Sequence, residues 1–312
     1  NILKGDLPIG DDPDFKEAFP DLARRLSPDW FFSLGLVSDT LVEARRLPTS
    51  VGLQSTDRPG SVDVFGEGQQ TTVAETLVVS LGLIKGNTTF KPPDYEFRFV
   101  PVFNVNQSRV EEVRALRVDP RAGTKRTDNH VGVQELFADV HLRNVSARYD
   151  FDSVRAGIQP FISDFRGFVF QDVAFGVRLF GTRDNNQWQY NLGWFRRLEK
   201  DTNSGLNDVT TPMRRDDVLV ANAFRQDFPV PGFPSQATAI LNVNREGEGA
   251  YYNNNGFLER PSSLGDERPH DYTVGYLGWS GDGHLGRWNL SASVYAAIGR
   301  DERHPLAGKA QD

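Results

Sequence analysis

Hydrophobic and polar residues alternate with a period of two in several long stretches of the chain. In the stretch 94–107, the alternate positions from Tyr95 to Val105 are aromatic or aliphatic, and those between them include Glu96 and Arg98. A period of two places the two sets on opposite faces of a β-strand. The stretches 187–198 and 286–298 alternate in the same way. Such stretches are longer than ordinary globular strands and match the roughly 9–11 residues with which a strand crosses a bilayer.

The same pattern predicts eleven strands along the chain. They are 30–46, 71–85, 94–107, 131–145, 153–161, 171–181, 187–198, 216–228, 236–245, 271–281 and 286–298. The connections alternate between long ones (47–70, 108–130, 162–170, 200–215 and 246–270) and short ones (86–93, 146–152, 182–185, 229–235 and 282–283). Short turns at one rim and longer loops at the other are typical of outer-membrane barrels. We therefore expect an all-β fold, an antiparallel up-and-down transmembrane β-barrel with about 11–12 strands in this chain.

The pattern also predicts how the chain is divided. Residues 1–29 are rich in proline and predict an N-terminal extension, and residues 30–312 predict the barrel domain. Bacterial single-chain barrels usually have an even number of strands. The eleventh strand is not followed by a returning strand or a terminal aromatic strand, so we expect the barrel domain to be truncated at its C-terminus. The alternative is one strand miscounted, within 30–46 for example.

Composition changes this picture little. Hydrophobic residues make up 38% of the chain and the mean hydropathy is −0.47, which is compatible with a barrel because its strands are apolar on one side only. No window approaches the 18 consecutive apolar residues of a membrane-spanning helix. The net charge of −7 comes without a basic stripe, which argues against nucleic acid as a partner. The chain has no cysteine, which excludes disulfides and cysteine-based metal or catalytic sites.

Candidate chemistry is scarce. The five histidines show no metal-ligand spacing, and no Gly-x-Ser-x-Gly elbow is present. His141 shares a polar strand face with Glu135 and Asp139, which we interpret as a hydrated wall and not a metal site. We therefore expect no catalytic residues, no metal, no cofactor and no enzymatic activity.

The stretch 154–180 combines two strands with a compact loop that is rich in charge and phenylalanine. The motif Arg155-Ala-Gly-Ile-Gln159, the loop, and then Phe175-Gly-Val-Arg-Leu-Phe180 resembles alginate-export-like and related specific porins of Gram-negative outer membranes. Asp271-Tyr-Thr-Val-Gly-Tyr-Leu-Gly278 resembles a strand of the same group. The resemblance covers roughly a tenth of the chain, and its motifs are not highly specific. The loop has more phenylalanine than the Gly/Ser/Arg-rich loop of that group, so the substrate is not carried over.

Rings of arginine select anions, and opposed carboxylates create a field across a narrow pore. We therefore predict that Arg155, Gln159, Asp164, Arg166 and Arg178 line a pore constriction. The alternative is a network of Asp164 with Arg166 that balances charge and plugs the barrel.

Together these patterns predict a porin-like channel in the cell outer membrane that passes small hydrophilic or anionic solutes. Its partners would be the lipid bilayer and the solute, and a homo-oligomer or an envelope protein partner is compatible with the sequence. One alternative is an outer-membrane scaffold or sheath for a periplasmic or envelope partner. Another is a secreted soluble β-rich carbohydrate-active protein, with Glu96, Glu135 and Asp139 as candidate carboxylates.

Overall fold

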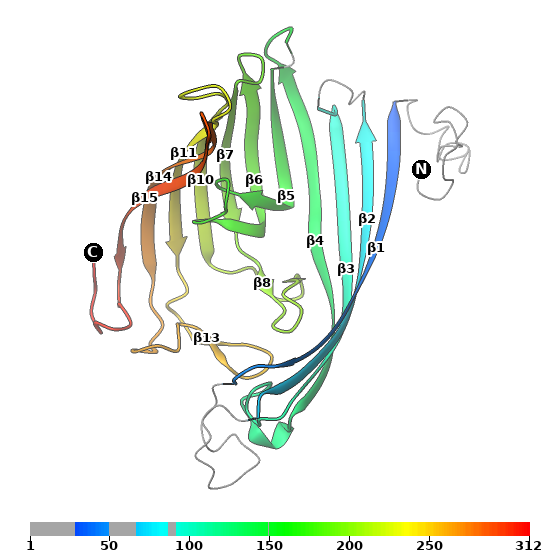
Figure 1. Ribbon diagram of the computed structural model, residues 1–312, viewed down its shortest axis with the longest axis vertical. Helices are drawn as coiled ribbons and strands as arrows, with labels where there is room; N and C mark the ends of the chain where they lie inside the picture. Colours follow the sequence, from blue (N-terminus) through cyan, green and yellow to red (C-terminus); the bar gives the residue numbers. More distant parts are fainter. Residues whose placement is uncertain (1–28, 50–66, 87–91, 149) are drawn as a thin grey trace.

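The computed structural model describes residues 29–49, 67–86, 92–148 and 150–312, and these form one large curved antiparallel β-sheet (Figure 1). Each strand pairs with the strands that precede and follow it in the sheet, in the order of the chain. The strands are β1 (Trp30–Arg46), β2 (Gln69–Lys85), β3 (Tyr95–Val110), β4 (Lys125–Asn144), β5 (Phe151–Ile162), β6 (Gln171–Arg183), β7 (Trp188–Arg196), β10 (Asp216–Arg225), β11 (Ser235–Asn244), β14 (Tyr272–Leu285) and β15 (Trp288–Asp301). The predicted N-terminal extension lies outside the described residues, except for Asp29.

The prediction of eleven antiparallel strands in sequence order is confirmed. The largest difference is in β4, which begins at Lys125 and not at 131, because residues 125–130 are polar on both faces and show no alternation. The pattern does not predict two hairpins within the long connections. These are β8 (Glu199–Lys200) with β9 (Asn207–Asp208), and β12 (Tyr251–Tyr252) with β13 (Leu258–Arg260), and their strands are too short to show a period.

The connections differ in length between the two ends of the sheet. One end of the sheet holds the strand ends that are joined by residues 47–68, 111–124, 163–170, 197–215 and 245–271. The other end holds those joined by residues 86–94, 145–150, 184–187, 226–234 and 286–287. Each connection of the first set is longer than the ones before and after it, as the sequence predicts. We call these two ends the long-loop end and the short-turn end. The connection 111–124 also contains a 3-10 turn, η3 (Pro120–Ala122).

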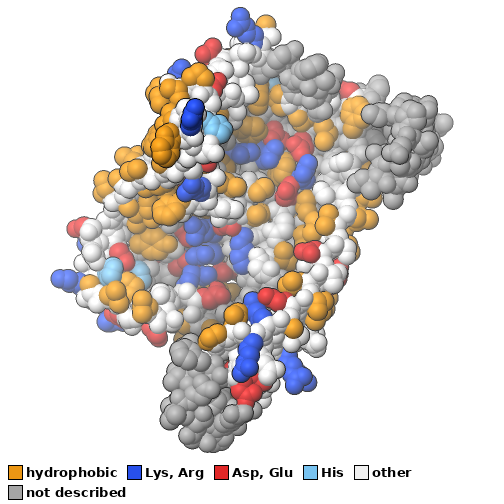
Figure 2. All heavy atoms as spheres, viewed as in Figure 1, with side chains coloured by type: hydrophobic (Ala, Val, Ile, Leu, Met, Phe, Trp, Pro, Cys, Tyr) orange, Lys and Arg blue, Asp and Glu red, His pale blue; other side chains and the backbone are white. Residues whose placement is uncertain are grey.

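Alternation along the strands gives the sheet two chemically different faces. The concave face encloses a hollow in which Lys, Arg, Asp and Glu side chains gather (Figure 2). The convex face carries mostly apolar side chains, and many of them are exposed. The large exposed ones include Leu34, Leu36, Val42, Val73, Leu77, Phe97, Phe99, Phe103, Val105, Val131, Leu136, Val177, Leu192, Leu219, Leu241, Leu277, Trp279, Val294 and Ile298.

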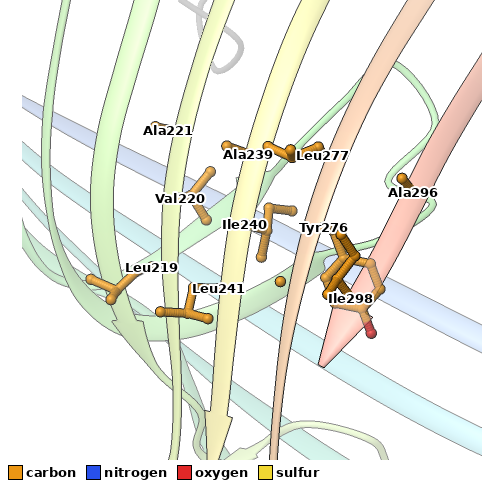
Figure 3. A pocket seen from close by; sticks show the side chains of 11 residues that line it. Leu219, Val220, Ala221, Ala239, Ile240, Leu241, Tyr276, Leu277, Ala296 and Ile298 are labelled. Atoms are coloured by element: carbon orange, nitrogen blue, oxygen red, sulfur yellow. The ribbon is translucent and has the colours of Figure 1, made fainter. Parts of the chain in front are cut away.

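No second layer of strands or helices covers the convex face in the described ranges. A groove on this face runs over β10, β11, β14 and β15, where the small residues Ala221, Ala239 and Gly275 lie between larger ones such as Leu241 and Leu277 (Figure 3). Contiguous exposed apolar surface of this kind is unusual on a water-soluble monomer. Among the described residues there is also no helix with the length and hydrophobicity needed to cross a bilayer.

The two edges of the sheet are β1 and β15. β1 pairs along its whole length with β2, and β15 with β14, and the described residues show no pairing between β1 and β15. The structure is therefore an eleven-stranded antiparallel meander, and closure into a barrel is not seen.

Candidate functional site

The connection 163–170, which we call the inward loop, bends into the hollow instead of extending beyond the sheet (Figure 1). Three side chains of the facing strands hold its first carbonyl group. The amides of Asn222 and Gln236 donate hydrogen bonds to the Ser163 oxygen at 3.1 and 2.8 Å, and the hydroxyl of Thr238 donates one at 3.3 Å. The loop is therefore tied to β10 and β11, across the hollow from the strands that carry it.

Asp164 fixes the shape of the inward loop. Its Oδ1 accepts hydrogen bonds from the backbone N–H of Arg166 at 2.8 Å and of Phe168 at 3.3 Å. Its Oδ2 accepts a hydrogen bond from the hydroxyl of Tyr295 on β15. Gly167 has a φ of 64°, a conformation that glycine adopts without strain, and a Cβ atom there would collide with a neighbouring side chain. Backbone, carboxylate and phenol together hold the loop in one conformation.

An apolar cluster lies between the loop and the inner face of the sheet. It comprises Phe161, Phe170, Ala174, Phe195, Val218, Val220 and Ile240. Phe195 is fully buried, with ring centroids 4.7 Å from Phe161 and 5.7 Å from Phe170. A Cβ atom at Gly176 or Gly193 would lie within 2.7 Å of this ring, so Phe195 packs directly on the backbone of β6 and β7. This part of the hollow is thus a small hydrophobic core that the loop covers.

The inner faces of β3, β4 and β5 carry a network of paired charges. The Nε of Arg98 lies 3.2 Å from a carboxylate oxygen of Glu96 and 3.6 Å from one of Glu135. A terminal nitrogen of Arg155 lies 2.8 Å from a carboxylate oxygen of Asp139 and 3.7 Å from one of Glu96. The three carboxylates are therefore all engaged by these two guanidinium groups.

Arg178 continues this row on β6, directly opposite Arg155. Its guanidinium lies over the ring of Phe180 at 4.5 Å and over that of Phe161 at 5.7 Å. Its Nε is buried without a hydrogen-bond partner, and no ion pair joins it to a carboxylate in the part of the chain that the structure describes. Of the three arginines in the row, Arg178 is the one that forms no ion pair with a described carboxylate. The carboxylate whose charge acts on it is that of Asp139, which is paired with Arg155.

Four of the five residues predicted to line a constriction lie in two groups, and Gln159 lies apart from both. Arg155 and Arg178 are side by side on the wall, and Asp164 and Arg166 are on the inward loop. Gln159 is fully buried, and its amide donates a hydrogen bond to a backbone carbonyl of β6 at 3.1 Å. Asp164 bonds to the backbone of Arg166 and not to its guanidinium, which remains exposed. The pore-lining role of all five stays a prediction.

The site also includes residues that the sequence analysis does not assign to it. Arg98, Asp139 and Tyr295 occupy positions predicted to be polar, and the pairing of the strands brings them to the hollow. Asn222 and Gln236 hold the loop from strands far away in the sequence. The only sequence signal for these contacts is a polar residue on the inner face of a strand, which does not name its partner.

The β8–β9 hairpin fills the space at the long-loop end, beside the lower part of β4 (Figure 1). The amide of Asn207 donates a hydrogen bond to the carbonyl of Val133 at 2.9 Å, and a ring nitrogen of His130 lies 3.3 Å from the Asn207 carbonyl oxygen. Lys200 forms an ion pair with Asp172 at 2.9 Å. The hairpin therefore bridges β4 and the start of β6.

A second group of paired charges lies at the rim of the long-loop end. Arg214 contacts Glu246 at 2.9 Å, and Arg260 contacts both Glu246, at 3.4 Å, and Glu199. Burial alone would raise the pKa of Glu246, but hydrogen bonds from Arg214 and Asn244 outweigh it and hold that pKa below the ordinary value. Burial lowers the pKa of Arg214, and the same carboxylate more than reverses this and raises it. These paired charges fasten the connections 197–215 and 245–271 together.

No group of three or more His, Cys, Asp or Glu side chains in the described ranges is arranged to hold a metal ion. The sequence places Glu135, Asp139 and His141 on one polar face of a strand. In the structure Glu135 and Asp139 contact arginines, and His141 forms a hydrogen bond with the side chain of Asn144 at 2.9 Å.

The arrangement can do three things chemically. It presents one unpaired guanidinium on the wall, narrows the hollow with a fixed loop, and offers an apolar surface on the opposite face of the sheet. Comparison of the chain with protein-family models, with curated proteins and with solved structures finds no match in any of the three.

Proposed function

We propose that this chain forms the wall of a porin-like channel in the cell outer membrane, through which small hydrophilic or anionic solutes diffuse. The observation that carries the proposal is the sidedness of a single-layer sheet, with exposed apolar side chains outside and a charged hollow inside (Figure 2). Lipid would cover the convex face, which no part of the described chain covers. In a bilayer every strand must also be paired, so the proposal requires that the edges β1 and β15 be joined into a closed wall.

The inward loop gives the proposed channel its narrow point. It is held in place by hydrogen bonds to β10, β11 and β15 and by an apolar cluster, so it acts as a fixed constriction and not as a mobile gate. The wall beside it carries Arg178, which forms no ion pair with a described carboxylate. A positive group at a constriction favours anions over cations.

Two measurements on the purified full chain test the proposal. Folded protein is expected to migrate differently on SDS gels before and after boiling, because a closed barrel resists SDS. In planar bilayers it is expected to produce stepwise conductance, and removal of residues 164–169 should increase the step because the constriction is lost. A chain that folds and shows heat-modifiable migration without any conductance would favour the scaffold over the channel. A chain that is soluble without detergent and unaffected by boiling would contradict the membrane assignment itself.

A further inference from the structure

The inward loop carries three side chains that remain partly or largely exposed. Phe168 is 76% exposed and Phe165 is 37% exposed. Arg166, between them, is also exposed. The backbone that carries them is fixed by Asp164 and by the clamped carbonyl of Ser163, so the three side chains stand on a rigid support.

Each ring is supported from one side only. Phe168 stacks on Tyr295, with centroids 5.9 Å apart and planes 25° apart. Phe165 meets Phe224 edge to face, with centroids 5.7 Å apart. Apolar surface left in water is unfavourable in proportion to its area. A ligand with a flat apolar surface would recover that free energy by covering the open face of Phe168.

Arg166 supplies the complementary polar group. Asp164 forms no ion pair with it; its carboxylate oxygens accept hydrogen bonds from backbone N–H groups and from Tyr295 instead. No ion pair of the described residues involves its guanidinium. A guanidinium group offers five N–H donors in a planar fork, which binds a carboxylate through two parallel hydrogen bonds.

The spacing of the three residues limits what they can hold at once. Residues 166 and 168 are two peptide units apart, so their Cα atoms lie at most about 7 Å from each other. One ring and one carboxylate in the same small molecule fit within that span. We propose that the inward loop binds an aromatic carboxylate, with its ring against Phe168 and its carboxylate on Arg166. The further step, that an aromatic carboxylate is the transported solute, rests on the proposed channel. The binding itself does not need transport.

Binding of three probes to the full chain in detergent tests the site. Benzoate carries ring and charge, benzamide carries the ring alone, and acetate carries the charge alone. We expect benzoate to bind about tenfold or more tightly than either of the others, measured by calorimetry with saturation-transfer NMR to detect ring contact. In R166Q, the affinity for benzoate should fall to that for benzamide, and the affinity for benzamide should not change. In F168L, which keeps apolar bulk but removes the ring, both aromatic probes should weaken.

Arg121→Gln is the matched control, since Arg121 is an exposed loop arginine on the 111–124 connection. It should leave all three affinities unchanged. Heat-modifiable migration of each variant verifies folding, and R166K provides a second charged variant that lacks the planar fork. Equal binding of benzoate and acetate, or full benzoate affinity in folded R166Q, would overturn the inference. Benzoate binding without conductance would support the binding site and contradict the channel. Conductance without benzoate binding would support the channel and contradict the binding site.

Discussion

The hydroxyl of Tyr295, on the last strand of the sheet, donates a hydrogen bond to the carboxylate of Asp164 on the inward loop, 131 residues earlier in the chain. The same tyrosine stacks with Phe168 of that loop. Together with the clamped carbonyl of Ser163, this contact ties the loop to the far side of the hollow. The loop is therefore held by β15 as well as by the strands from which it emerges.

Replacing Tyr295 by Phe should loosen the inward loop without removing the ring contact. A hydrogen bond to a charged group contributes roughly 1.5–3 kcal/mol, so the free energy of unfolding should fall by about that amount. Urea unfolding followed by tryptophan fluorescence measures the loss, and channel current should become noisier as the loop moves. Tyr252→Phe, at an exposed position of β12, is the control and should have no effect. Unchanged stability in Tyr295→Phe would mean that the clamp of Ser163 alone holds the loop.

Adjacent residues on β15 test the sidedness of the sheet. Val294 lies on the convex face and is 68% exposed, and Ser293 lies on the concave face. An arginine facing the middle of a bilayer costs roughly 2–4 kcal/mol, whereas one facing a wet interior costs little. We expect Val294→Arg to reduce insertion into liposomes and stability there, and Ser293→Arg to insert normally. Equal tolerance of both substitutions would contradict a lipid-facing convex surface.

Arg178 is expected to set the ionic preference of the proposed channel. Arg178→Gln removes the one arginine charge of the inner row that forms no ion pair with a described carboxylate, so the permeability ratio of chloride to potassium should fall severalfold. Reversal potentials in a salt gradient give this ratio. Arg178→Lys keeps the charge and should retain most of the preference, and Arg121→Gln should retain all of it. If Arg178→Gln and wild type share one reversal potential, Arg178 does not face the ion path.

The rim carboxylate Glu246 should make stability depend on pH. Its pKa is lowered in the folded protein, because hydrogen bonds from Arg214 and Asn244 outweigh the burial that would raise it. A group with a lowered folded pKa contributes its full stability above its unfolded pKa of about 4.3 and loses it as the pH falls through the folded value. Wild type should therefore exceed Glu246→Gln in stability at pH 6, and the difference should shrink below about pH 4.3.

Urea unfolding midpoints at pH 6, 5, 4 and 3 measure this difference. Glu248→Gln is the control, since this neighbouring carboxylate is 82% exposed. Its midpoints should follow those of wild type at every pH. A constant gap between wild type and Glu246→Gln over the whole series would show that Glu246 acts through packing and not through its charge.

Most of the sheet is predictable because a strand with one apolar and one polar face must alternate with a period of two. Phe97 and Phe99 point outward and Glu96 and Arg98 inward, as the pattern in 94–107 predicts. The start of β4 is different, because residues 125–130 are polar on both sides, and their strand conformation comes from pairing with β3.

The site is only partly predictable, because its contacts join residues that are far apart in the chain. Arg155 and Arg178 can be placed on one face from periodicity, but only the register shows that they are directly opposite each other. Gln159 lies on the same polar face as Arg155, yet its side chain is buried. The inward course of the loop depends on side chains such as Asn222 and Tyr295, which no local pattern connects to residue 163.

The order of the strands constrains how the wall can be completed. Directions reverse at every step from β1 to β15, and eleven is an odd number, so the two outermost strands point the same way. If β1 and β15 paired directly with each other, that pair would be parallel in an otherwise antiparallel sheet. A closed sheet in which all neighbouring strands are antiparallel would need an odd number of further strands between β15 and β1. The first and the last of these strands would run opposite to β1 and β15.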